Sequence, residues 1–253
     1  MTLTPQTFFI VCPLLFLAGF VDSIGGGGGL ISLPAYLIAG LPIHQAIATN
    51  KLSSTFGTAL AALRFIKNRL VNFRLAVPSV IMAVIGSSLG ANLSLRMDEK
   101  VMHYILFLVL PVTAFVVLNK NLFHDNEDNP AGINRRTYIT AMTAAFIIGI
   151  YDGFYGPGTG TFLIIAFTVF AKMNIRSANA HTKVINLTTN LTALTVFLLD
   201  GQVLLPLGLA AAVCNMAGNY LGSGLVLTKG TKIVKPIILI VLFLLLLKIL
   251  GIF

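Results

Sequence analysis

The stretch GFVDSIGGGGGLISLP, residues 19–34, places an aspartate and five consecutive glycines inside an otherwise apolar segment near the start of the chain. Each glycine in a helix interior costs about 1 kcal/mol relative to alanine, so a run of five does not continue a helix. The stretch therefore predicts a break between two helices. The composition of the chain decides in which environment this break lies.

The composition is that of a polytopic membrane protein. Of the 253 residues, 57% are hydrophobic and 10% charged, and the mean hydropathy is +0.92. Most of the bases behind the net charge of +9 lie in short gaps between apolar runs, where they set membrane orientation. The expected partner is therefore the lipid bilayer, and no nucleic acid is expected. Cys12 and Cys214 lie in apolar runs and are expected to pack rather than form a disulfide or metal site.

Ten apolar segments are long enough to be helices in a bilayer. Two short ones, 30–41 and 159–171, each follow a glycine-rich break, and about 12 residues span only about 18 Å of a core about 30 Å thick. The first apolar run has no basic stretch before it, so we expect a retained membrane segment and no cleaved signal. The segments are 6–24, 30–41, 46–65, 73–94, 101–118, 137–155, 159–171, 178–198, 203–227 and 232–253.

The two halves of the chain match each other in four places, in the same order. GFVDSIGGGG (19–28) aligns with GIYDGFYGPG (149–158), and ATNK (48–51) aligns with AHTK (180–183). GSSLG and KVMHYILFLVL of the first half have the later counterparts GNYLG and KIVKPIILIVL. We therefore expect one integral membrane domain made of an N-terminal repeat (1–118), a polar linker (119–136) and a C-terminal repeat (137–253).

The loop charges indicate that the two repeats have opposite orientation. Lysines and arginines gather in the gaps 64–74, 172–177 and 228–235, whereas the gaps 41–46 and 199–202 have none. Basic loops stay in the cytoplasm, so equivalent loops of the two halves are expected on opposite sides. The predicted fold class is an all-α polytopic membrane protein. It has two inverted repeats, each a broken helix pair plus three transmembrane helices, with a cytoplasmic linker and both termini outside.

The two glycine breaks are candidate anion sites. A helix that restarts after a break directs unpaired N–H groups and the positive end of its dipole towards it. Irregular backbone at membrane depth is either buried in protein or lines a cavity, so tight hairpin tips packed on neighbours remain the alternative. Neither break matches a nucleotide-binding motif, and no cofactor is expected. The candidate residues are Gly25, Gly26, Gly27, Gly28 and Gly29 in the first copy and Gly156, Gly158 and Thr159 in the second.

Two lysines, Lys51 and Lys183, lie a few residues into the helices that follow the short segments. An ionised lysine within a membrane helix faces a cavity, a partner or the interface, so snorkelling to the membrane surface is the alternative to a functional role. Both lysines lie in polar surroundings that would hydrate a permeation path, although such groups also bond across helices. The polar candidates for substrate binding beside them are Asn50, Ser54, Asn186 and Asn190.

Three further ionisable residues are candidates for coupling. Asp22 and Asp152 precede the two breaks, and each either pairs with the lysine of its own or the opposite half or takes up a proton. His181 is the third candidate, because free histidine titrates near neutral pH, but it has no histidine counterpart in the first half. No catalytic constellation and no metal-spaced histidine cluster is evident in the sequence, so neither an enzyme nor a metal site is expected.

Two further patterns of small and polar residues occur within the predicted membrane helices. Gly86 and Gly90 repeat as Gly218 and Gly222, a G-x-x-x-G pattern that predicts close helix packing. Asn215 and Asn219 share one helix face and either line a cavity or bond a neighbouring helix.

The doubled motif resembles the sulfite exporter TauE/SafE family of membrane permeases. The residues are VDSIGGGGGLISLPAYLIAGLPIHQAIATNK and YDGFYGPGTGTFLIIAFTVFAKMNIRSANAHTK, and the resemblance covers about residues 8–252. It implies a secondary carrier of sulfite, sulfoacetate, related sulfonates or carboxylates in the bacterial cytoplasmic (inner) membrane. The second copy departs from the motif: no proline stands at the position of Pro34, and His181 precedes Thr182 and Lys183.

The expected mechanism is alternating access, in which a small anion binds near mid-membrane between the two breaks and one half of the chain then rocks against the other, coupled to protons or sodium. A passive anion channel would use the same polar lining, and an intramembrane enzyme using Asp22 and Asp152 is the weaker alternative. The sequence leaves the transport direction, the coupling ion and the choice between monomer and homodimer open.

Overall fold

The computed structural model describes residues 4–98, 100–101, 134–229, 232–233 and 236–237, and within them it contains helices and no strands. The predicted segment 101–118 and most of 232–253 lie outside the described residues. The elements are α1 (Pro5–Gly25), α2 (Gly29–Ile38), α3 (Ile43–Lys67), α4 (Phe73–Arg96), α6 (Arg135–Phe154), α7 (Thr159–Ile165), the π-helix η2 (Ala166–Phe170), α8 (Ile175–Leu199) and α9 (Leu205–Lys229).

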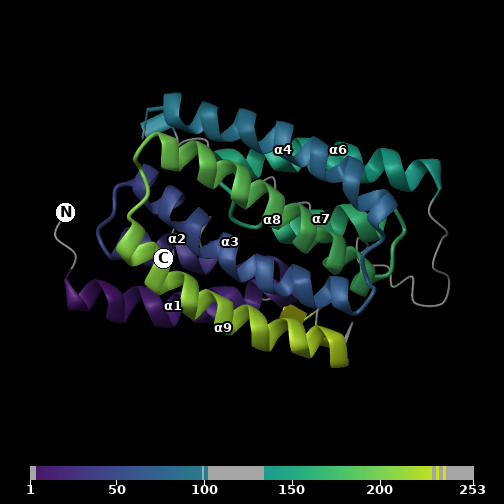
Figure 1. The fold of residues 1–253 in the computed structure, drawn as a ribbon, viewed down its shortest axis with the longest axis horizontal. Coiled ribbons are helices and arrows are strands. Elements are labelled where there is room, and N and C mark those ends of the chain that lie inside the picture. Colours follow the sequence, from purple (N-terminus) through teal and green to yellow (C-terminus); the bar gives the residue numbers. More distant parts are fainter. Residues whose placement is uncertain (1–3, 99, 102–133, 230–231, 234–235, 238–253) are drawn as a thin grey trace.

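The long helices run side by side in one bundle (Figure 1). The most extensive contacts join α4 with α6 and α1 with α9, and α3 and α8 lie between these two pairs and contact each other. Each outer pair therefore joins a helix of the first half of the sequence to a helix of the second. The short helices α2 and α7 connect α1 to α3 and α6 to α8.

Local signals in the sequence explain where the helices begin and end. Asn72 and Asn174 accept hydrogen bonds from main-chain N–H groups in the first turns of α4 and α8. Asn134 and Thr137 form a capping box at the start of α6. Gly26 ends α1 with a left-handed φ of 78°, which glycine adopts without steric cost.

The predicted helices agree with the structure apart from their ends. The segment predicted at 46–65 begins at Ile43, directly after Pro42, and the one predicted at 178–198 begins at Ile175, after the cap Asn174. These first turns contain polar residues, so a search for apolar runs starts them too late. The second short segment is two elements, α7 and η2, in place of one.

The G-x-x-x-G pattern packs helices closely, as predicted. A Cβ added at Gly90 would lie 2.0 Å from the Ile150 carbonyl oxygen of α6, and one at Gly218 would lie 2.0 Å from the Phe16 carbonyl oxygen of α1. Only glycine permits such an approach of two backbones, and it is what allows the α4/α6 and α1/α9 pairs to form.

Asn215 and both cysteines lie between α1 and α9. The Asn215 side chain donates a hydrogen bond to the Leu15 carbonyl oxygen, 3.3 Å away, so it bonds a neighbouring helix. Cys12 and Cys214, far apart in the sequence, are free thiols that lie near each other in the structure. The interface between these helices thus combines glycine packing with buried polar contacts.

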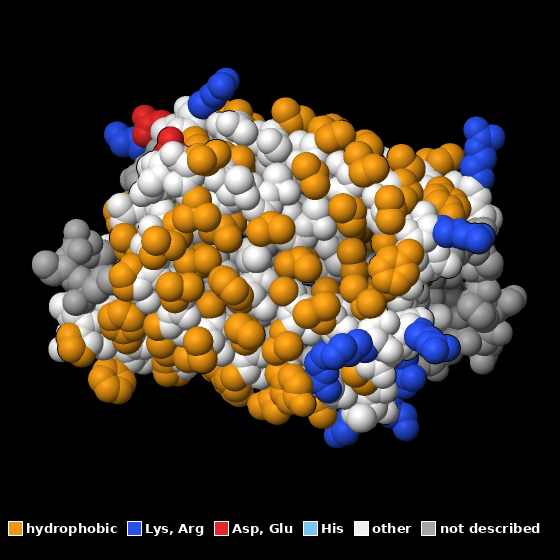
Figure 2. All heavy atoms as spheres, in the orientation of Figure 1, with side chains coloured by type: hydrophobic (Ala, Val, Ile, Leu, Met, Phe, Trp, Pro, Cys, Tyr) orange, Lys and Arg blue, Asp and Glu red, His pale blue; other side chains and the backbone are white. Residues whose placement is uncertain are grey.

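The surface has an apolar middle and charged ends. In the described part of the chain, α1, α4, α6 and α8 are long and apolar enough to cross a membrane. Hydrophobic side chains cover much of the visible face, and lysines and arginines gather towards its ends (Figure 2). Exposed Val77 and Ile81 on α4 and Val213 on α9 would each be unfavourable in water by about 1.5–3 kcal/mol relative to burial, which fits contact with lipid.

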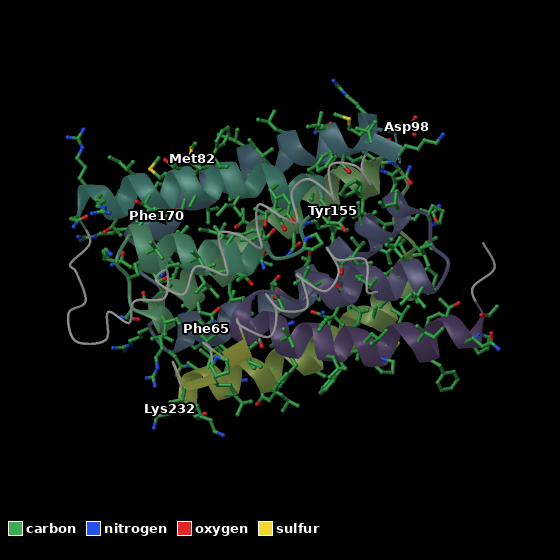
Figure 3. All side chains as sticks on the ribbon, turned by 180° about the vertical axis from the view of Figure 1, so that it is seen from behind. Phe65, Met82, Asp98, Tyr155, Phe170 and Lys232 are labelled. Atoms are coloured by element: carbon green, nitrogen blue, oxygen red, sulfur yellow. The ribbon has the colours of Figure 1, made fainter. Side chains whose placement is uncertain are left out.

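The basic loops lie together at one end of the bundle. Ser177 at the start of α8 bonds the Leu70 carbonyl oxygen, and Arg176, Lys229 and Lys232 line one surface cleft. Asp98 and Lys232 lie at opposite ends (Figure 3). The loops that the charge pattern assigned to one side therefore share one end of the molecule.

Candidate functional site

The two glycine breaks contact each other backbone to backbone at the centre of the structure. A Cβ added at Gly26 would lie 2.2 Å from the Gly160 carbonyl carbon, and one at Gly160 would lie 2.5 Å from the Gly26 Cα. The Thr161 hydroxyl donates a hydrogen bond of 2.7 Å to the Gly25 carbonyl oxygen across this crossing. Both positions therefore require glycine, because any side chain would separate the two breaks.

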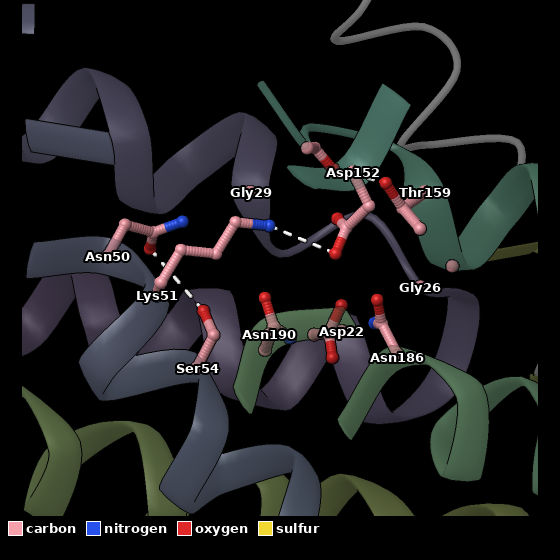
Figure 4. A pocket seen from close by; sticks show the side chains of 12 residues that line it. Asp22, Gly26, Gly29, Asn50, Lys51, Ser54, Asp152, Thr159, Asn186 and Asn190 are labelled. Carbon is pink, nitrogen blue, oxygen red and sulfur yellow. Dashed lines mark hydrogen bonds and ion pairs between the residues drawn. The ribbon is translucent and has the colours of Figure 1, made fainter. Parts of the chain in front are cut away.

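A polar cavity of about 20 Å³ lies beside the crossing (Figure 4). This volume holds one or two water molecules, so an anion of several heavy atoms enters only if the surrounding helices move apart. The helices α1, α2, α3, α6, α7 and α8 or the breaks next to them all contribute to its wall. The lining residues are Asp22, Gly26, Gly29, Asn50, Lys51, Ser54, Asp152, Gly156, Thr159, Gly160, Asn186 and Asn190.

Two buried ion pairs link the halves of the sequence. Lys51 Nζ on α3 lies 3.0 Å from Asp152 Oδ2 on α6, and Lys183 Nζ on α8 lies 2.7 Å from Asp22 Oδ2 on α1. Each aspartate thus pairs with the lysine of the opposite half and not with that of its own half. Removing one partner of such a pair leaves a buried charge uncompensated, at a cost of about 3–5 kcal/mol.

The two ion pairs differ in their hydrogen bonds. Lys183 Nζ donates to both the side chain and the main-chain oxygen of Asp22, and the Gly28 N–H donates to Asp22 Oδ1 at 3.4 Å. Lys51 Nζ and Asp152 Oδ2 are close enough for an ion pair but are not aligned as a hydrogen bond. Oδ2 is buried and accepts no hydrogen bond from the described residues. Lys51 and Asp152 both line the cavity, whereas Lys183 does not.

Several hydrogen-bond donors in the cavity wall are unused. Gly29 begins α2 and Gly160 lies in the first turn of α7, and neither main-chain N–H donates a hydrogen bond within the described residues. The side-chain amides of Asn186 and Asn190, which are 5% and 4% exposed, also have no hydrogen-bond partner there. Unpaired donors and two helix N-termini at one place suit an anion. Asn50 instead accepts a hydrogen bond of 3.5 Å from Ser54.

The remaining candidate residues lie outside the cavity wall. Gly25, Gly27, Gly28 and Gly158 shape the breaks without lining the cavity, and Gly158 has a left-handed φ of 86° before α7. His181 Nε2 accepts a hydrogen bond of 3.1 Å from the Asn72 N–H and so ties α8 to the α3–α4 loop.

Gly160 was missed by the sequence reasoning. Its counterpart in the alignment of the halves is Leu30, so the repeat gave no reason to select it. The alternation of glycine and threonine at 158–161 was the available signal. Within the described residues no group of three or more metal-ligating side chains occurs.

Comparison with known proteins places this site in a transporter family. The family model described as "Sulfite exporter TauE/SafE" matches residues 11–249. The chain is 38% identical over 227 residues to the probable membrane transporter protein ORF9 of Sinorhizobium sp., covering 89% of this chain and 85% of that protein. It is 36% identical over 249 residues to the probable membrane transporter protein YfcA of Escherichia coli, covering 94% and 90%.

A probable membrane transporter protein of Haemophilus influenzae is also 36% identical, over 230 residues, covering 90% of this chain and 88% of that protein. No solved structure matches the chain. The family match spans nearly the whole sequence, including both breaks, both lysines and both aspartates. The chain therefore belongs to the TauE/SafE family of membrane transporters.

Proposed function

We propose that the protein is a secondary active transporter of small sulfur-containing or organic anions, such as sulfite, sulfoacetate or related sulfonates. The observation that supports this most is the cavity beside the glycine crossing, in which Lys51, the starts of α2 and α7 and two unpartnered asparagine amides converge. A positive charge and several free donors in a buried site are the groups that a carboxylate or sulfonate requires. The substrate class rests on the family's description as sulfite exporters.

The proposed binding site consists of the cavity residues of the two breaks and the polar groups of α3 and α8. Lys51 supplies the positive charge, the Gly29 and Gly160 N–H groups supply main-chain donors, and Asn186 and Asn190 supply side-chain donors. Gly26 and Gly156 allow the backbone to come close to the ligand. Asn50, Ser54 and Thr159 complete the polar wall.

The proposed mechanism is alternating access around this cavity, in two repeats of inverted orientation. The small cavity volume supports a closed conformation that widens to either side in turn. The closest helix pairs, α1/α9 and α4/α6, each join one helix of each repeat. We therefore expect each pair to move as one body, so that the moving parts are not the two sequence repeats as separate blocks. The proposed location is the bacterial inner membrane, with both termini outside.

The proposal is tested by transport into proteoliposomes that contain the purified protein. Uptake of labelled sulfite, sulfoacetate, taurine and lactate is measured with and without an imposed pH gradient or sodium gradient. We expect accumulation of at least one of the anions in the presence of a gradient, and at least tenfold slower uptake by Lys51→Ala, which removes the cavity's positive charge.

Liposomes with Asn68→Ala, a change on the exposed α3–α4 loop, are the matched control and should transport at the wild-type rate. Flux that only dissipates a concentration gradient would instead indicate a passive channel. A folded protein that moves none of these anions would refute the proposed function.

A further inference from the structure

We propose that Lys51 and Asp152 form the exchangeable ion pair of the transporter, where one anion and one proton bind together, while Lys183 and Asp22 form a permanent brace. This inference rests on the proposed function and specifies its coupling. It starts from the unequal surroundings of two ion pairs that the repeat of the sequence makes equivalent.

The contacts of the two lysines assign different roles to the pairs. Lys183 is fully buried, lies outside the cavity wall and donates to two oxygens of Asp22. Lys51 faces the cavity, and its ammonium group, which carries three donors, has only the unaligned carboxylate of Asp152 as a partner among the described residues. An incoming anion can therefore contact the Lys51 ammonium group without breaking a hydrogen bond.

The charge of the cavity requires a second species to enter with the anion. With both pairs ionised, the two lysines and two aspartates carry no net charge. A monoanion alone would add one uncompensated negative charge at a buried site, which is strongly unfavourable. A proton taken from water by Asp152 Oδ2 restores neutrality, because Lys51 then balances the anion and Asp152 is neutral. No covalent bond to the anion forms, and the same proton returns to water when the anion leaves on the other side.

The groups around Asp152 favour it as the proton acceptor over Asp22. Two other charged residues, Lys51 of α3 and Asp22 of α1, line the same cavity as Asp152. The helices α2, α7 and α8 contribute only uncharged groups to the cavity wall. On its own helix, the adjacent Tyr151 lies near it. The Asp22 side chain is more exposed than that of Asp152, 14% against 3%, which favours access of water. Protonation of Asp22 would nevertheless weaken its bonds to Lys183 and the Gly28 N–H, whereas Asp152 Oδ2 has no hydrogen bond to any described residue that protonation would weaken.

The test compares Asp152→Asn in proteoliposomes with the double variant Asp22→Asn/Lys183→Met, which removes the whole second pair. The main probe is lactate, which stays a monoanion above about pH 5, and sulfite and sulfoacetate are measured in parallel. For one proton per monoanion, a gradient of one pH unit should drive about tenfold accumulation of lactate by the wild type, since each 1.4 kcal/mol is tenfold. A membrane potential set with potassium and valinomycin should not change this accumulation, because no net charge moves.

Asp152→Asn should exchange the anion across the membrane with no accumulation in response to the pH gradient, and Asp152→Glu should restore it. The double variant Asp22→Asn/Lys183→Met, which removes the second pair and leaves the net charge of the site unchanged, should retain the gradient response at a reduced amount of folded protein, which size-exclusion chromatography reports. Accumulation driven by the membrane potential, or a pH response that survives in Asp152→Asn, would overturn the inference while leaving anion transport intact. If Asp22→Asn/Lys183→Met is folded and loses the response, the roles of the two pairs are reversed and the inference is overturned. Absence of transport of every anion by the wild type would refute the proposed function and the inference together.

Discussion

At the scale of single residues, the site depends on glycines, which have no side chain, as much as on its charged and polar residues. Gly26 and Gly160 allow the two breaks to touch, and this contact holds the starts of α2 and α7 against one cavity. The spacing of Asp22, Gly26 and Lys51 was visible in the sequence. Their partners across the molecule were not, because these partners lie at least 100 positions away in the sequence.

The crossing makes a prediction about Gly160. Gly160→Ala would place a Cβ 2.5 Å from the Gly26 Cα, and because backbone cannot yield as a side chain can, we expect a loss of about 2–4 kcal/mol and a lower Tm in detergent. Gly224→Ala is the control, since its Cβ would meet only the end of the Arg64 side chain at 3.2 Å. Equal melting temperatures for the two variants would contradict the packing of the breaks.

At the scale of helices, the local sequence determines where each helix lies along the chain, and tertiary contacts determine how the helices are arranged in the bundle. The apolar runs and the glycine breaks are local, and they predicted the approximate positions of the described helices. The order of the helices in the bundle was not predictable in this way. The order depends on contacts between helices, such as those that Gly218 and Asn215 of α9 make with α1. These contacts form only when both helices are folded and packed together.

The pairing of α1 with α9 can be tested through the natural cysteines. Cys12 and Cys214 are free thiols that lie near each other, so mild oxidation with copper phenanthroline should join them in a disulfide and remove both free thiols. Mass spectrometry of the digested protein would identify the linked peptides. Because the two helices are expected to move as one body, transport should remain within about twofold of the reduced protein.

The cross-link has two informative failures. Two thiols that still react fully with maleimide after oxidation would contradict the α1/α9 interface. A disulfide that forms but abolishes transport would show that the two helices separate during the transport cycle. Cys214→Ser is the control for oxidation of either thiol alone.

At the scale of the whole molecule, charge and hydropathy determine how the protein lies in the membrane. The apolar middle of the surface matches a bilayer, and the basic loops gather at one end (Figure 2). Sequence alone predicted which loops share a side, since lysines and arginines are retained in the cytoplasm. The three-dimensional arrangement brings those loops together through bonds such as the one between Ser177 and Leu70.

The orientation can be checked by cysteine labelling in intact cells. In a background with Cys12→Ser and Cys214→Ser, Asp200→Cys at the loop without bases should react with a membrane-impermeant maleimide. Asn68→Cys, exposed at the basic end, should react only after the cells are permeabilised. The reverse pattern would place the basic end outside and contradict the predicted topology.

The sequence by itself determined the class of the protein, its helices and breaks, the matching halves and the residues with the chemistry to bind an anion. These properties follow from composition, spacing and capping, which act over one or a few helical turns. Only the tertiary structure decided that Lys51 faces Asp152 and Lys183 faces Asp22, that Gly160 supports Gly26, and that only one of the lysines reaches the cavity. The reason is physical: two equivalent positions in a repeat have the same local sequence signals, and they become different only when each is packed against its own neighbours.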